Sequence, residues 1–210
     1  MKLCMIGTGY VGLVSGVCFA DIGNQVICVD KDKKKINKLN SGISPIYEPG
    51  LNELIKKNFV AKRLSFTTDI KKAISISDII FICVGTPTRK GSIQVDLSFV
   101  YKCTKEILKY SKRKKIIVTK STVPVGTGDE IEKILKKKKK LFTVISNPEF
   151  LREGEAIRDF RYPDRIVIGS NEKKTFNIMR KLYAPLTNKG SKFFSTSRRG
   201  AELIKYASNA

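Results

Sequence analysis

A glycine-rich turn near the amino terminus is the feature that most restricts how this chain can fold. Gly7, Gly9 and Gly12 stand in the pattern G-x-G-x-x-G directly after the apolar residues 3–6. A strand that enters such a turn and leaves it as a helix presents free backbone N–H groups and the positive end of a helix dipole. The pattern therefore predicts a strand-turn-helix unit that binds the pyrophosphate of a dinucleotide.

Each glycine of this turn has a different expected role. Gly7 permits the tight turn, Gly9 lets the backbone approach the phosphates, and Gly12 lets the helix pack close to the strand. Tyr10 and Val11 lie inside the pattern, and we include both in the predicted cofactor site.

An acidic residue closes the second apolar run of the chain. Asp30 follows residues 26–29 and lies eighteen positions beyond Gly12. A carboxylate at this point accepts hydrogen bonds from the adenosine ribose hydroxyls, and it repels the 2′-phosphate of NADP. The spacing favours NAD over NADP, whereas FAD, which uses the same pattern, stays open on these residues.

The apolar amino-terminal stretch could also be read as a secretory signal, because Lys2 precedes it and small residues end it near residue 20. Four glycines interrupt the stretch, and a second strand follows at the spacing of a βαβ unit, so we reject that reading. The sequence contains no apolar run long enough for a membrane span.

The cysteines indicate a reducing compartment. They are five in number, lie in apolar contexts without C-x-x-C pairs, and are accompanied by no histidine. This pattern argues against a disulfide framework and against a metal site, and it is typical of small core residues. We therefore expect a cytoplasmic protein. The residues concerned are Cys4, Cys18, Cys28, Cys83 and Cys103.

The formal charge of +22 raises the question of a nucleic-acid partner, and residues 136–140 are five consecutive lysines. The basic residues are nevertheless spread over the chain, without interleaved aromatic residues and without a known nucleic-acid-binding motif. We expect a solvated lysine-rich surface and no nucleic-acid partner, with the charge attracting anionic ligands at long range.

Apolar strand-like runs alternate with helical segments along the chain. The length suits one large domain, and the alternation predicts a doubly wound parallel α/β sheet of the Rossmann type over residues 1–196. Residues 197–210 read as the first turns of a further helix, with Ala201, Ile204 and Ala207 or Ser208 on one face. The expected strands are 2–6, 26–29, 79–84, 116–119, 142–145 and 165–168, the clearest helices are 97–112 and 127–140, and the expected loops are 42–50 and 85–92.

Three loops rich in hydroxyl, carboxylate and glycine groups follow predicted strands, at residues 84–87, 120–127 and 147–154. Each could be ordinary turn chemistry. Ligands of open α/β sheets bind at the carboxyl ends of the strands, so three such loops on one edge predict a shared site beside the glycine turn.

Six ordered motifs resemble those of the UDP-glucose 6-dehydrogenase family. They occupy residues 5–13, 45–51, 83–87, 121–127, 147–154 and 201–205. Related enzymes that act on GDP-mannose or UDP-N-acetylmannosamine share most of these motifs. Residues 46–48 and 162–169 are closest to the UDP-glucose branch.

The resemblance implies oxidation of the C6 alcohol of UDP-glucose to a carboxylate while two NAD molecules are reduced in turn. It implies that Glu149 and Thr122 hold and activate water, and that Lys205 and Asn209 stabilise oxyanionic intermediates. The same resemblance also implies which residues contact NAD and which contact the substrate. The NAD contacts are Asp30, Lys35, Thr86, Thr122 and Glu153, and the substrate contacts are Glu149, Phe150, Leu151, Arg152, Glu153, Lys205 and Asn209.

In the resembling family the nucleophilic cysteine lies in a glycine-rich loop downstream of these motifs, ahead of a second Rossmann-like domain. None of the five cysteines here falls in that motif. We therefore expect this chain to bind NAD without completing the oxidation. The intact enzyme is expected to be a homodimer and this chain a monomer. A poorly folding, non-catalytic remnant is the alternative, because an incomplete helix exposes apolar surface.

Overall fold

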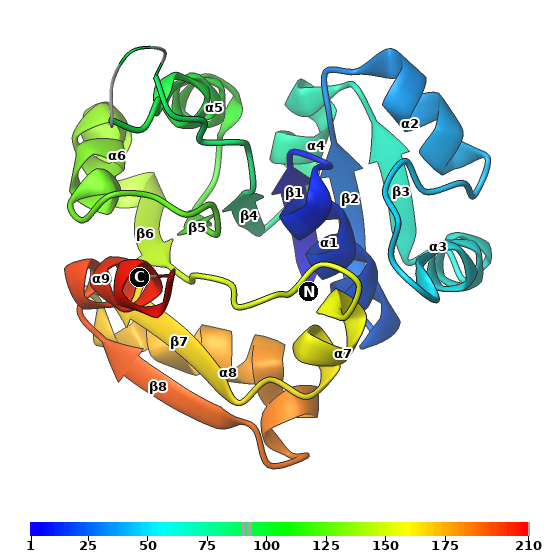
Figure 1. Ribbon diagram of the computed structural model, residues 1–210. Coiled ribbons are helices and arrows are strands. Elements are labelled where there is room, and N and C mark those ends of the chain that lie inside the picture. Colours follow the sequence, from blue (N-terminus) through cyan, green and yellow to red (C-terminus); the bar gives the residue numbers. More distant parts are fainter. Residues whose placement is uncertain (90, 92–93, 210) are drawn as a thin grey trace.

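A computed structural model describes residues 1–89, 91 and 94–209 of the chain. Its centre is an eight-stranded sheet in the order β3-β2-β1-β4-β5-β6-β7-β8, with helices on both faces (Figure 1). The strands are β1 (Lys2–Ile6), β2 (Gln25–Val29), β3 (Leu64–Thr67), β4 (Ile79–Ile82), β5 (Lys115–Thr119), β6 (Phe142–Ser146), β7 (Arg165–Ser170) and β8 (Lys192–Thr196). The doubly wound α/β prediction is confirmed.

The helices follow the strands along the chain. They are α1 (Tyr10–Asp21), α2 (Lys33–Asn40), α3 (Leu51–Val60), α4 (Ile70–Ile76), α5 (Ser98–Tyr110), α6 (Thr127–Leu135), the 3₁₀ segment η1 (Lys136–Leu141), α7 (Ala156–Arg161), α8 (Lys173–Thr187) and α9 (Arg198–Asn209). Of the predicted loop 85–92 and helix 197–210, residues 90, 92 and 210 lie outside the described residues.

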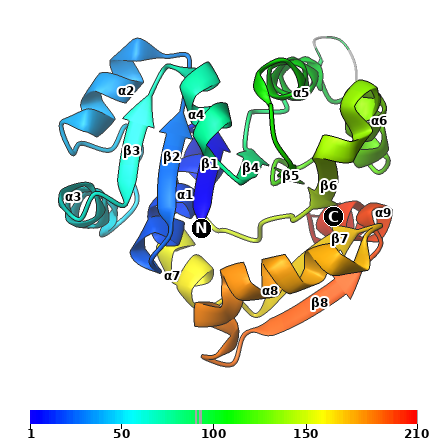
Figure 2. The same ribbon diagram turned by 180° about the vertical axis from the view of Figure 1, so that it is seen from behind.

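The sheet divides the core into two layers (Figures 1 and 2). Leu3 and Met5 of β1 belong to one buried cluster, whereas Cys4 and Ile6 of the same strand belong to the other. This alternation follows from the two-residue period of a strand, and burial on both faces explains the continuous apolar runs in the sequence. No helix in the described part of the chain is both apolar and long enough to span a bilayer.

The sequence predicted a parallel sheet, and one pair of neighbouring strands departs from that prediction. β6 and β7 are antiparallel and pair only at Ile145–Ser170 and Ser146–Gly169, at their carboxyl ends. The segment between them contains the short helix α7 and does not return the chain to the opposite edge of the sheet, so the direction reverses. β7 and β8 are again parallel to each other.

The predicted helix 127–140 is shorter than expected. α6 ends at Leu135, and the lysine run continues as η1, in which Lys138 leaves helical geometry with φ −130° and ψ 40°. Adjacent like charges repel one another on a helix surface, and a run of lysines offers no apolar face for packing.

Candidate functional site

The glycine turn between β1 and α1 has the geometry that the sequence predicted. Gly7 has φ +102°, and a Cβ there would come within 2.7 Å of the Cys83 carbonyl oxygen. A Cβ at Gly12 would overlap the Gly7 carbonyl oxygen. A Cβ at Gly9, by contrast, has no described atom within 4 Å, so this side of the turn has room for a phosphate. Gly9 is also the N-cap of α1 and has no side chain to occupy the helix N–H groups.

Asp30, at the end of β2, is tied to this turn. Its Oδ2 accepts hydrogen bonds from the Thr8 backbone N–H at 2.9 Å and the Thr8 hydroxyl at 2.8 Å, and it lies 3.4 Å from Lys35 Nζ. Its Oδ1 accepts the Asp32 N–H at 3.1 Å. Burial alone raises the pKa of the carboxyl, but these hydrogen bonds and Lys35 outweigh it and leave the pKa below its ordinary value. An ionised carboxylate therefore stands beside the turn at neutral pH.

Tyr10 connects the first turn of α1 to the loop that precedes α7. Its hydroxyl donates to the Glu48 carboxylate and accepts the Gly154 N–H at 2.7 Å. The same carboxylate accepts the N–H groups of Gly154 and Ile157, each at 3.0 Å. Burial and the bond to Glu48 raise the pKa of Tyr10 to about 12. Val11, half-buried, follows Tyr10 on α1.

Tyr10→Phe is expected to lower the free energy of unfolding by about 1–3 kcal/mol, because the Glu48 carboxylate loses a donor in a partly buried site. Equilibrium urea unfolding measures this change. Tyr47→Phe is the matched control, since that ring is 85% exposed, and it is expected to have no effect. Equal stability of Tyr10→Phe and the unchanged chain would contradict this view of the contact.

Two of the predicted cofactor loops meet directly. The Thr86 hydroxyl, in the loop after β4, donates to the Thr122 carbonyl at 2.9 Å, in the loop after β5. The Ser121 hydroxyl donates to the Val84 carbonyl at 2.7 Å. Because the Gly7 turn abuts Cys83, these loops and the glycine turn share the carboxyl edge of the sheet. Glu153 is exposed and lies next to Gly154, the partner of Tyr10.

The structure pairs two residues that come from different predicted motifs. Lys205 Nζ of α9 lies 3.2 Å from Glu149 Oε1, and both side chains are largely buried. Glu149 Oε2 accepts the Leu151 N–H at 2.7 Å. The ammonium of Lys205 lies 5.4 Å from the ring centroid of Phe150, and the guanidinium of Arg165 lies 4.4 Å from it. Asn209 is exposed, one turn beyond Lys205 on α9.

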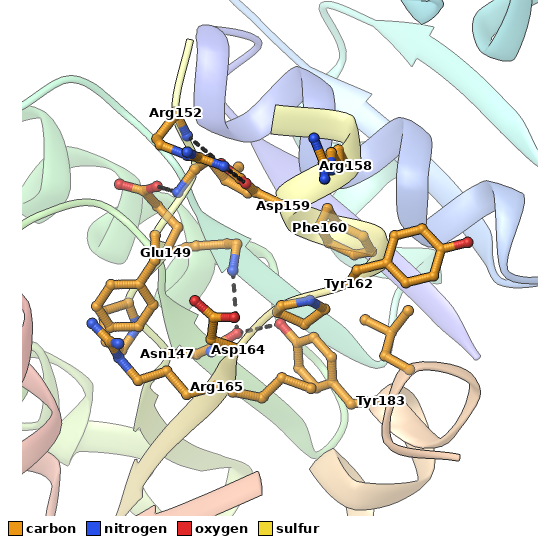
Figure 3. Close-up of a pocket in the computed structure, with 17 residues that line it drawn as sticks. Asn147, Glu149, Arg152, Arg158, Asp159, Phe160, Tyr162, Asp164, Arg165 and Tyr183 are labelled. Atoms are coloured by element: carbon orange, nitrogen blue, oxygen red, sulfur yellow. Dashed lines mark hydrogen bonds and ion pairs between the residues drawn. The ribbon is translucent and has the colours of Figure 1, made fainter. Parts of the chain in front are cut away.

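A pocket of about 640 Å³ lies between the loop after β6 and the β7–α8 layer (Figure 3). Glu149, Phe150, Leu151 and Arg152 contribute to its lining. Arg152 forms an ion pair with Asp159 at 2.7 Å at the edge of this pocket. Three of the predicted substrate residues, Glu153, Lys205 and Asn209, are described but are not part of the lining.

Three residues that the sequence analysis did not select meet within this pocket. Asn147 Oδ1 accepts a hydrogen bond from the Tyr183 hydroxyl at 2.6 Å (Figure 3). The same oxygen lies 3.4 Å from Lys120 Nζ. Lys120 is buried, and burial lowers the pKa of its amine. A single buried lysine cannot be recognised among so many lysines in a sequence, and only its position in the predicted loop 120–127 gives a signal.

A model of the NAD-binding domain of the UDP-glucose/GDP-mannose dehydrogenase family matches residues 1–187. The chain belongs to this family. The matched domain binds NAD, so the dinucleotide predicted from the glycine turn is NAD rather than FAD.

Relatives of the family align with the whole chain. It is 53% identical to a UDP-glucose 6-dehydrogenase of Rhizobium meliloti and covers 49% of that protein. It is 50% identical to the UDP-glucose 6-dehydrogenase TuaD of Bacillus subtilis and covers 45% of it. The chain thus spans about half the length of the curated relatives it matches.

Solved structures of the family are also similar in fold. A GDP-mannose dehydrogenase from Pseudomonas aeruginosa matches with a TM-score of 0.93 and 37% identity, over 100% of this chain and 49% of that one. A UDP-glucose dehydrogenase from Pyrobaculum islandicum matches with a TM-score of 0.92 and 36% identity, over 99% of this chain and 48% of that one.

The cysteines of this family member are core residues, as the sequence predicted. All five are buried and free. Burial raises the pKa of Cys18 and Cys83 to about 12 and that of Cys103 to about 11, and it raises those of Cys4 and Cys28 as well. A buried thiol with a raised pKa is a poor nucleophile, because the thiolate is the reactive form.

Proposed function

We propose that this domain is the cofactor-binding part of a UDP-glucose 6-dehydrogenase, which oxidises UDP-glucose to UDP-glucuronate with two molecules of NAD. The observation that carries the proposal is the buried Glu149–Lys205 pair on the sheet edge that also holds the glycine turn. A carboxylate and an ammonium held together beside a hydride acceptor suit the oxidation of an alcohol.

The open face of Gly9 and the ionised Asp30 fit NAD. In the proposal the N–H groups of the glycine turn and of the first turn of α1 hold the pyrophosphate, with Tyr10 and Val11 beside it. Asp30 accepts from the adenosine ribose. Lys35, Thr86, Thr122 and Glu153 are the further proposed NAD contacts. When bound, NAD accepts the hydride that leaves the sugar carbon.

Residues of the loop after β6 and of α9 serve the sugar in this proposal. Lys205 stabilises negative charge on the reacting oxygen, and Asn209 is its companion donor. Glu149 and Thr122 position water, and the carboxylate of Glu149 accepts a proton from it. Phe150, Leu151, Arg152 and Glu153 contact the substrate.

A second candidate substrate is GDP-mannose, which is favoured by the similarity to a GDP-mannose dehydrogenase over the whole chain. UDP-glucose takes precedence because the curated relatives at 53% and 50% identity carry that name. Saturation transfer from the NAD-loaded chain to the sugar protons tests this choice. A transfer to GDP-mannose that exceeds the transfer to UDP-glucose would reverse it.

We further propose that this chain, alone, is a monomer and binds NAD. We also propose that it does not complete the oxidation, since its thiols are all buried. Calorimetric titration with NAD and then NADP tests the cofactor site, and NADH absorbance with UDP-glucose tests the rest. Saturable binding that is tighter for NAD supports the proposal. A cooperatively folded chain that binds neither nucleotide would contradict the proposed NAD binding. Steady NADH production would contradict the proposal that the chain does not complete the oxidation.

A further inference from the structure

Glu202 of α9 is a buried carboxylate that the proposed chemistry does not use. Its side chain is 3% exposed. Its Oε2 accepts the Gly126 N–H at 2.7 Å, and its Oε1 accepts the Gly128 N–H at 2.8 Å and the Ser146 hydroxyl at 3.1 Å. The carboxylate thus joins α9 to the start of α6 and to the end of β6.

The local backbone explains why α6 needs this partner. Gly126 is the N-cap of α6, has φ +96° and carries no side chain that could accept the first N–H groups of the helix. Glu202 supplies the missing acceptor from another helix. Its negative charge also lies at the positive end of the α6 dipole.

The same carboxylate lies between two segments of the proposed site. The loop that ends at Gly126 contains Thr122, and Ser146 is three residues before Glu149. Lys205 lies one turn after Glu202 on α9, and both residues border one small void of about 10 Å³ together with Ser121 and Ser146. Very little free space therefore separates Glu202, which binds the two segments, from Lys205, which pairs with Glu149.

We propose that Glu202 is a positioning residue, which fixes the Thr122 loop relative to Lys205 and so sets the cofactor side of the site against the substrate side. This inference rests on the proposed roles of Thr122 and Lys205. Glu202 touches neither reactant in it. It acts through the backbone of Gly126 and Gly128 and through the helix that also carries Lys205.

The neighbouring ion pairs of α9 provide a matched control. Arg198, one turn before Glu202, pairs with Asp129 and with Glu132 of α6, and Arg199 pairs with Asp129 at 2.6 Å. Asp129→Asn therefore weakens the docking of α9 on α6 and leaves the Glu202 hydrogen bonds in place. Glu202→Gln keeps the shape of the side chain but replaces one acceptor oxygen by a donor.

The experiment compares the two variants in the 210-residue chain by NAD calorimetry and by ¹H–¹⁵N spectra. Glu202→Gln is expected to bind NAD about fivefold more weakly and to shift the amide signals of Gly126, Gly128, Thr122 and Lys205, because a small misplacement of a site is costly. Asp129→Asn is expected to bind NAD within about twofold of the unchanged chain, although both variants melt at lower temperature.

Glu202→Asp keeps the charge on a shorter stem and replaces Glu202→Gln if that variant does not fold. Unchanged NAD affinity in the Glu202 variant, or an equal loss in Asp129→Asn, would overturn the inference and leave Glu202 a purely structural cap. If the unchanged chain binds no NAD, the proposed function fails. The amide signals then decide the inference: shifts of Thr122 and Lys205 larger than in Asp129→Asn support it, and equal shifts overturn it.

Discussion

Gly12→Ala is expected to lower the free energy of unfolding by about 3 kcal/mol, at the upper end of the cost of overpacking a core. The added Cβ would overlap the Gly7 carbonyl oxygen and lie 2.9 Å from the Cys83 Cβ. Neither neighbour can move cheaply, because one is backbone in the turn and the other is a buried residue at the end of β4. Thermal and urea unfolding measure the loss.

Gly9→Ala separates cofactor binding from stability in the same turn. Its backbone, at φ −70° and ψ −171°, suits any residue, and its Cβ has no described neighbour within 4 Å. Stability should therefore fall by no more than about 1 kcal/mol, the cost of alanine at an N-cap position. NAD affinity should fall at least about tenfold, because the methyl group occupies the path of the pyrophosphate. Undiminished NAD binding by Gly9→Ala would show that the nucleotide lies elsewhere, and a stable Gly12→Ala would refute the close packing of α1.

Asp30→Ala is expected to weaken NAD binding by about 10- to 100-fold, the equivalent of hydrogen bonds to one charged acceptor. The same variant should lose most of its preference for NAD over NADP, because no carboxylate then repels the 2′-phosphate. Thr8 also loses its partner for both the N–H and the hydroxyl, so the turn itself becomes less fixed. Parallel calorimetric titrations with the two nucleotides measure both effects.

Asp32→Ala is the control for Asp30→Ala. Asp32 lies two residues further on and caps α2 by accepting the Lys35 N–H at 3.1 Å. Its loss should cost about 1 kcal/mol of stability and leave the nucleotide preference unchanged. Equal effects of the two substitutions on NAD would mean that the position of α2, rather than the Asp30 carboxylate, governs affinity.

The sequence predicted strands wherever burial on both faces produced an apolar run. β3 escaped detection because it is short and alternates buried with more exposed positions. β8 is an edge strand in which every residue is exposed or half-buried, and its sequence lacks the longer apolar run that marks the buried strands. The reversal at β7 depends on the path of the intervening segment, and that path is not encoded in the pattern of a single strand.

Within the candidate site, the glycine turn could be predicted because the glycines and the turn that they form lie in the same short segment. The contacts of Tyr10 could not, since its partner Gly154 is 144 residues away. Glu48 lies in the motif 45–51, but no local pattern indicates that it caps α7. Lys205 was selected through the family resemblance alone, and its pairing with Glu149 depends on how α9 docks.

The buried face of α9 is not the apolar face that the sequence indicated. The sequence places Ala201, Ile204 and Ala207 or Ser208 on one face of the helix, whereas the buried residues are Arg198, Ala201, Glu202 and Lys205. Leu203 and Tyr206 are 57% and 38% exposed. The reason is that this face of α9 meets the polar start of α6 and Glu149 rather than the apolar core.

Mutational tolerance along α9 should consequently run opposite to hydropathy. In most amphipathic helices, selection purges polar changes at apolar positions and accepts changes among charged ones. Within this domain the buried charged positions Arg198, Glu202 and Lys205 are the intolerant ones, together with the buried Ala201, whereas the exposed Leu203 and Tyr206 are free to vary. A variant-effect score that weights hydrophobicity would therefore misrank substitutions at these charged and exposed apolar positions.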